Sequence, residues 1–395
     1  MRTVRCALAT AVASLALLAG GAAAAPYTPA SDDEVVERLP VASDPALRAV
    51  ESLRRQLASR PGDDALRLDL GERYFALAMA QGDPRYVGYA LSSIAPLEKT
   101  APNDSRYWLV RGLLQQYSHD FESALASLKR ASAIDPQAVE PVAWRAAIHM
   151  VEARYAWAAA ECDRLARMAP GLLAQGCTAY VRATTGQLIP AYQMLSDSVS
   201  QAQEVEPALM VWLQTRLAEM AVRLQRWGDA ERHYRSALAQ GVTDQFLLAS
   251  YADFLLQRGR PQEAVQLLAG WERSDVLLLR LALAGRAVNH PRAGEWLAQL
   301  RDRFEAAARR GDRLHEQEAA RWALELEHDA GKALALARSN FAQQREPRDA
   351  EILLRAALAA RNPAAAQPAL EWLRASGYED PAMQALAARL TGGRR

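Results

Sequence analysis

The sequence predicts an all-α solenoid of antiparallel helix pairs, and three observations support this fold class. Good helix formers such as Ala, Leu, Arg, Gln and Glu dominate, and runs that alternate apolar and polar residues, as strands do, are absent. Prolines recur at an interval of 34 residues, at Pro102, Pro136 and Pro170. Small residues share this interval of 34, as Ala124 and Ala158 show. A repeat of this length is typical of stacked helix pairs.

The N-terminal residues predict export. A short basic head, residues 1–5, precedes an apolar, uncharged stretch from Cys6 to Gly20, and small residues follow up to Ala25. This is the pattern of a secretory signal, so we expect residues 1–25 to be cleaved and the mature chain to be periplasmic or secreted. The alternative is an uncleaved membrane anchor, but the apolar stretch is shorter than the roughly 20 residues that span a bilayer. No later segment predicts a transmembrane helix.

The remaining chain divides by how closely it follows the repeat. We expect four parts: an acidic lead-in and capping helix at 26–62, well-formed pairs at 63–204 and again at 205–273, and degenerate pairs with a C-terminal cap at 274–390. The segments 171–203 and 275–345 fit the repeat least well. These parts predict roughly nine helix pairs.

The clearest unit runs from Ser105 to Pro136. Trp108 leads its first helix, Gly112 allows the second helix to approach closely, and Phe121 opens the second helix. Ala124 supplies the small residue where the two helices cross. With these residues the unit resembles the tetratricopeptide repeat. The resemblance implies a right-handed superhelical solenoid whose concave groove is lined by the first helix of each pair.

The preceding unit also resembles this family. The segment Leu70–Tyr74, with the sequence LGERY, is similar to the core of the family's first helix. The unit needs about two extra turns before Ala90, so we expect its helices to be longer than standard.

The resemblance nominates a binding surface in the groove. The residues in the groove positions are Arg106, Leu109, Leu113, Gln116, Tyr117, Trp144, Met150, Trp212, Arg216, Glu219, Arg223, Phe246 and Asp253. The aromatic side chains are suited to anchor a partner and the arginines to receive carboxylates. The alternative for each aromatic residue is ordinary packing between helices. These positions carry no lysine, so the family's clamp for a peptide C-terminus is not expected.

Two cysteines remain after signal removal. Cys162 falls in the second helix of one pair and Cys177 in the first helix of the next, across a short loop with Pro170 and Gly171. An oxidising compartment would permit a disulfide between them, and two buried free thiols are the alternative.

The sequence offers no sign of chemistry of its own. It contains no nucleophile elbow, phosphate-binding loop or dinucleotide fingerprint, and its 6 histidines form no metal-ligand spacing. We therefore expect no catalytic residue, no cofactor and no metal. The 47 basic and 46 acidic residues nearly balance, which argues against a nucleic-acid partner.

These observations favour an exported scaffold that binds a protein or peptide partner in its groove. The alternative is a periplasmic accessory subunit of an envelope export or polysaccharide-secretion complex. An enzyme is the third class, and nothing in the sequence favours it.

Overall fold

The structure, a computed structural model, describes residues 45–392. The predicted signal, 1–25, and residues 26–44 of the predicted lead-in lie outside the described residues. Every regular element of the described part is a helix, as the sequence predicts. In chain order the helices are α1 (Pro45–Ser59), α2 (Asp64–Gln81), α3 (Arg85–Ile94), α4 (Leu97–Thr100), α5 (Ser105–Tyr117), α6 (Phe121–Ile134), α7 (Glu140–Val151), α8 (Tyr155–Met168), α9 (Leu172–Thr184), α10 (Leu188–Gln201), α11 (Pro207–Arg223), α12 (Trp227–Leu238), α13 (Gln245–Gln257), α14 (Pro261–Leu267), α15 (Asp275–Ala287), α16 (Ala293–Arg310), α17 (Glu316–Trp322), the π-helix η1 (Ala323–Glu327), α18 (Ala330–Gln343), α19 (Pro347–Ala359), the 3₁₀-helix η2 (Pro363–Ala366), α20 (Gln367–Ser376) and α21 (Pro381–Gly392).

Short polar side chains fix where many of these helices begin. Asp104 accepts hydrogen bonds from the first amides of α5, Asp120 from Ser123 in α6, and Asp244 from Leu247 in α13. Such caps satisfy amides that have no partner inside the helix. The repeat boundaries are therefore encoded locally, one cap at a time.

Small residues set the close contacts within each pair. The alanines at the helix crossings, Ala124, Ala158, Ala230 and Ala264, have none of their surface exposed. Gly112 also allows a close contact between the two helices, because a Cβ there would lie 2.8 Å from Leu128 Cγ and 3.3 Å from the Ala124 carbonyl oxygen. The two helices can approach this closely only while no larger side chain intervenes.

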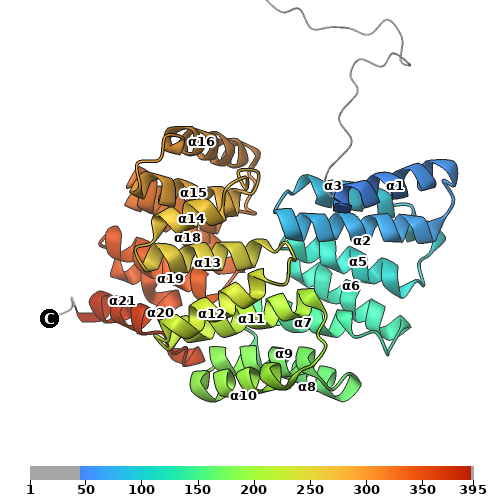
Figure 1. Cartoon of the computed structure of the whole chain (residues 1–395), viewed down its shortest axis with the longest axis horizontal. Helices are drawn as coiled ribbons and strands as arrows, with labels where there is room; N and C mark the ends of the chain where they lie inside the picture. Colours follow the sequence, from blue (N-terminus) through green and yellow to red (C-terminus); the bar gives the residue numbers. More distant parts are fainter. Residues whose placement is uncertain (1–44, 393–395) are drawn as a thin grey trace, which may run out of the picture. The chain divides into compact units, whose positions relative to one another are not determined.

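The first helices of successive pairs form one continuous inner row. In it α2 contacts α5, α5 contacts α7, and the series continues through α9, α11, α13, α15, α17 and α19 to α21. The second helices lie on the outside of this row, so the row winds into a superhelix (Figure 1). The described residues are therefore a tetratricopeptide-like solenoid.

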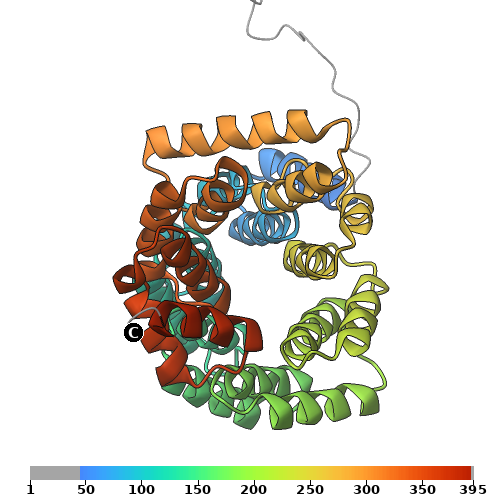
Figure 2. The same cartoon turned by 90° about the vertical axis from the view of Figure 1, so that its left-hand side faces the viewer.

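The superhelix makes more than one turn and its second turn packs on its first. Helix α13 contacts α2, and Gly82 at the end of α2 lies directly against Gln245 and Ser274. Figure 2 looks along the axis around which the helices of residues 45–392 wind. Residues some 160 to 190 positions apart in the sequence become neighbours in this way, which determines the composition of the inner surface.

The two segments that fit the 34-residue repeat least well differ from each other in the structure. Residues 171–203, which fit the repeat poorly, form an ordinary pair, α9 and α10, with Gly176 packed closely against Trp212 and Leu213. Residues 275–345 are less regular. Helix α16 extends over 18 residues to Gly311, and α17 runs into the π-helix η1. This added length disrupts the 34-residue register.

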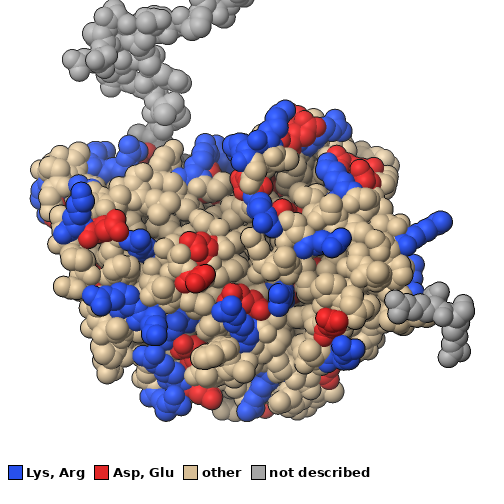
Figure 3. Space-filling view, turned by 180° about the vertical axis from the view of Figure 1, so that it is seen from behind, with Lys and Arg blue, Asp and Glu red and all other residues tan. Residues whose placement is uncertain are grey.

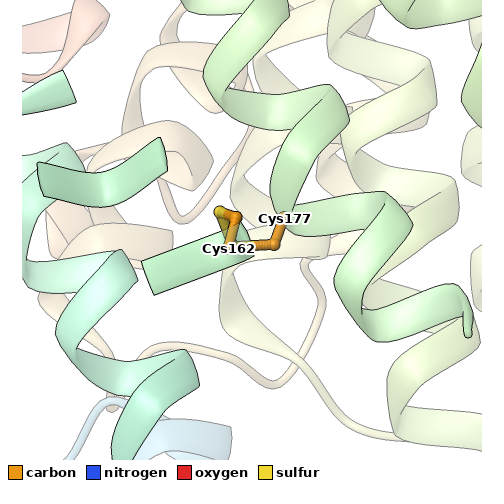
Figure 4. Close-up of a disulfide and its surroundings, with 2 residues drawn as sticks. All are labelled: Cys162 and Cys177. Atoms are coloured by element: carbon orange, nitrogen blue, oxygen red, sulfur yellow. A yellow bond between two sulfur atoms is a disulfide. The ribbon is translucent and has the colours of Figure 1, made fainter. Parts of the chain in front are cut away.

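The cysteine pair joins two repeats. Cys162 on α8 and Cys177 on α9 form a disulfide, with 5.5 Å between their Cα atoms (Figure 4). The bond therefore ties the second helix of one pair to the first helix of the next.

Candidate functional site

The inner surface of the superhelix contains a cavity of about 520 Å³, which we call the inner cavity. Its lining includes residues of both superhelical turns, from Met79 at the end of α2 to Asp349 in α19. Its apolar wall is formed mainly by the first helices and carries Tyr117, Trp144, Met150, Tyr180, Trp212 and Phe246. Its polar wall carries Arg216, Glu318, Glu346, Arg348 and Asp349. A few polar groups converging on an apolar chamber are typical of a ligand site.

The nominated groove residues separate into three groups. Lining the inner cavity are Gln116, Tyr117, Trp144, Met150, Trp212, Arg216 and Phe246. Lining a second cavity of about 530 Å³ are Arg216, Glu219, Arg223, Phe246 and Asp253. Lining neither are Arg106, Leu109 and Leu113.

The third group has other contacts. Leu113 is buried in the hydrophobic core and Leu109 packs against that core, because the faces they occupy on α5 point toward neighbouring helices. Arg106 is half-exposed and forms ion pairs with Asp69 at 2.7 Å and Glu72 at 2.9 Å on α2.

The nominated arginines already have partners within the chain. Arg216 forms an ion pair with Glu219 at 2.9 Å and stacks over the Tyr180 ring. Arg223 donates hydrogen bonds to the carbonyl oxygens of Ala183 and Glu379, and its guanidinium lies 3.7 Å from the Tyr378 ring centroid. Both guanidiniums are therefore engaged within the chain, although the Nε of Arg216 has no hydrogen-bond acceptor among the described residues.

The second cavity is crossed by a network of ion pairs. Asp253 accepts from Arg280 at 2.9 Å and from Arg321 at 2.7 Å. Burial alone would raise the pKa of Asp253, but the two guanidiniums outweigh it and lower the pKa. Arg321 also contacts Glu325, which pairs with Arg355. In this network the positive and negative charges pair with one another within the chain.

Carboxylates stand out on the polar wall of the inner cavity. Glu346 pairs with Arg348 at 3.0 Å, and the Asp349 carboxylate accepts from the Asn340 amide at 2.9 Å. Burial, with the nearby charge of Glu346, raises the pKa of Asp349 well above its ordinary value. Glu318 is 7% exposed and, within residues 45–392, its carboxylate has neither a hydrogen bond nor an ion pair.

Of this polar wall the sequence nominates Arg216 alone, and not its acidic residues or Arg348. Its acidic residues lie in the second superhelical turn, opposite first-turn helices such as α5 and α7. Their proximity depends on the superhelical pitch, which no local pattern in the sequence reports.

The site shows no arrangement that suggests catalysis. Among residues 45–392 no group of three His, Cys, Asp or Glu side chains could hold a metal ion.

In the same range no helix is both long and apolar enough to cross a membrane. On the face seen in Figure 3, basic and acidic side chains are interspersed rather than gathered by sign.

No protein-family model matches the sequence, and no curated protein is similar to it. Solved structures of similar fold include a tetratricopeptide repeat protein from Parabacteroides merdae ATCC 43184, with 16% identity, a TM-score of 0.46, and 60% of this chain and 92% of that chain covered. NprR in complex with its cognate peptide NprX has 14% identity, a TM-score of 0.46, and coverage of 75% and 92%. PilW, a type IV pilus biogenesis factor, has 22% identity, a TM-score of 0.36, and coverage of 51% and 91%. At these identities the similarity concerns the fold alone.

Proposed function

We propose that this tetratricopeptide-like solenoid is an exported scaffold that binds a peptide segment of a protein partner on the inner surface of its superhelix. The observation that carries the proposal is the inner cavity, where aromatic side chains from several first helices converge. Trp144, Trp212 and Phe246 belong to different pairs, yet they line one chamber. Aromatic side chains in such a chamber are the usual anchors of a binding hot spot.

Export is part of this proposal. The basic and apolar residues at 1–25 have the pattern of a cleaved signal. A disulfide between Cys162 and Cys177 is the kind of bond that oxidising compartments sustain. Cell fractionation followed by N-terminal sequencing tests it. We expect a periplasmic or secreted chain that begins after Ala24 or Ala25, and a cytoplasmic chain with an intact N-terminus would contradict export.

Site-specific crosslinking tests partner binding. A photoreactive phenylalanine replaces Ala147, which is exposed and lines the inner cavity. The matched control carries the same group at Trp157, which is 67% exposed on the outer helix α8. We expect the first variant to crosslink to one defined protein of the producing cell, identified by mass spectrometry, and the second not to do so.

The crosslink must also respond to competition. A synthetic peptide that covers the crosslinked segment of that protein should suppress it. Equal crosslinking from positions 147 and 157, or a crosslink that the peptide does not suppress, would count against binding on the inner surface.

A further inference from the structure

We propose that the inner cavity selects a partner group with an apolar body and a cationic head, such as a lysine or arginine side chain or a free amino terminus beside an apolar residue. This inference rests on the proposed function and deepens it, because it names the chemistry that the partner presents. The group recognised is positively charged, whereas a partner carboxylate would be negatively charged.

The cavity has the size and walls for such a group. Its volume of about 520 Å³ lies within the roughly 300–1,000 Å³ of small-ligand sites. Trp144 and Trp212 face it from the first-turn helices α7 and α11, and Phe246 lines it from α13. These rings supply apolar contact, and the Arg348 guanidinium already lies over the Phe246 ring, 5.4 Å from its centroid.

Glu318 supplies the charge. It lies on α17, lines the cavity and is 7% exposed. In the described range, 45–392, nothing donates a hydrogen bond to its carboxylate and no cation pairs with it. An ammonium or guanidinium group in the cavity would form a close, charge-assisted hydrogen bond with this carboxylate.

Arg348 attracts Glu318 electrostatically, but the close ion pair of Arg348 is with Glu346. The two guanidiniums of the lining each have a carboxylate of their own, Glu219 for Arg216 at 2.9 Å and Glu346 for Arg348 at 3.0 Å. An anionic ligand would therefore meet Glu318 without gaining a free cation, and like charges at close range repel. The electrostatics thus favour a cation.

One polar atom suggests a peptide in particular. The Nε of Arg216 is buried and has no hydrogen-bond partner among the described residues. Its charge is already paired with Glu219, so what this N–H lacks is an acceptor, and a peptide carbonyl oxygen is a suitable one. A basic peptide segment satisfies both Arg216 and Glu318.

Two probes that differ only in charge sign test the proposal: 4-phenylbutylamine and 4-phenylbutyrate. Each is titrated into the full mature chain by calorimetry at neutral pH and low salt. We expect the amine to bind at least about tenfold more tightly than the carboxylate, since a tenfold ratio corresponds to about 1.4 kcal/mol. The substitution Glu318→Gln should remove this preference.

Two further variants make the result specific. Glu316→Gln makes the same change on the same helix, but Glu316 lies outside the cavity lining and pairs with Arg313 at 3.2 Å, so the preference for the amine should persist. Ala147→Trp fills the cavity from an exposed inner position, so binding of the amine should be lost. Circular dichroism confirms that each variant is folded.

The proposal is overturned if neither probe binds, if the carboxylate binds as tightly as the amine, if Glu318→Gln keeps the preference, or if the amine still binds the Ala147→Trp variant. A partner that crosslinks at position 147 while the amine shows no preference would sink this inference and leave the proposed function standing. If the amine binds in a Glu318-dependent way but no partner crosslinks at position 147, the charge preference of the cavity stands and the proposed function fails.

Discussion

At the scale of single residues, the turns inside the helix pairs hold unusual backbone conformations. The turn residues with positive φ include His119 at 60°, Gln225 at 58° and Asn289 at 53°, none of them glycine. A residue with a Cβ pays roughly 1–2 kcal/mol for this region, and glycine does not. The pairs therefore tolerate some local strain to reverse direction in few residues.

Gln225→Gly should stabilise the protein. Gln225 is exposed and its φ is 58°, so glycine relieves strain there without removing core contacts. We expect the free energy of unfolding, measured by urea denaturation, to rise by about 0.5–1 kcal/mol. The matched control Gln384→Gly lies at an exposed position inside α21 and should destabilise by about 1 kcal/mol. A loss of stability in both variants would contradict the strain at Gln225.

His119 should make stability depend on pH. Burial, helped by the nearby charge of His315, lowers the pKa of His119 to about 4. Because its pKa is lower folded than unfolded, acid favours the unfolded chain, so this stability is present above about pH 6.5 and is lost as the pH falls toward about 4. Asparagine tolerates the φ of 60° at this position. Between about pH 7 and 4.5, His119→Asn should lose about 2 kcal/mol less unfolding free energy than the parent chain. Parallel pH profiles would exclude this role.

At the scale of elements, close helix approach depends on particular glycines. Gly112→Ala places a Cβ 2.8 Å from Leu128 Cγ, and Leu128 is fully buried. We expect a loss of about 1–3 kcal/mol in urea unfolding, because a packed core cannot accept the added volume without shifting. Gly228→Ala is the matched control: its Cβ would meet nothing within 4 Å, so the better helix former should stabilise α12 by up to about 1 kcal/mol. Equal effects of the two substitutions would mean that packing at Gly112 is not limiting.

The helix pairs are also what the sequence predicts best. Gly112, Phe121 and Ala124 occupy the positions that the repeat assigns to them, because their roles depend on neighbours within one pair. The region 275–345 was harder to predict. Its extra residues are absorbed by the 18-residue α16 and by the π-helix η1, which have no proline or alanine signature of their own.

At the scale of the whole described unit, the candidate site depends on the superhelix. Several first-turn residues of the inner cavity, such as Tyr117 and Trp144, could be nominated because they lie on first helices. Glu318 and Arg348 could not, because they reach the cavity only when the second turn packs on the first. Leu113 was nominated for the groove, but the face of α5 that carries it points toward the hydrophobic core, where it is buried.

Polar contacts hold the two turns together. The Arg345 amide donates to the Val151 carbonyl oxygen at 2.8 Å, the Trp372 indole donates to the Tyr155 hydroxyl at 2.8 Å, and the Leu188 amide donates to the Glu379 carboxylate at 2.6 Å. Contacts of this kind are easier to separate than a continuous apolar core. The region around α20 and α21 should therefore open before the helix pairs themselves unfold.

Arg223→Ala tests this order of opening. Arg223 on α11 bonds the Glu379 carbonyl oxygen and stacks on Tyr378, so its loss weakens the contact with the second turn. We expect amides of α20 and α21 to exchange about tenfold faster with deuterium, since one charged hydrogen bond contributes about 1.5–3 kcal/mol, while amides of α5 and α6 keep their rates. Arg258→Ala is the matched control. Arg258 is exposed and stacks on Trp227 in the neighbouring helix α12, so its loss should leave exchange in α20 and α21 unchanged. Uniformly faster exchange along the chain in the Arg223 variant would mean that the two turns separate only when the whole protein unfolds. A ligand would then have to enter the inner cavity while both superhelical turns stay packed together.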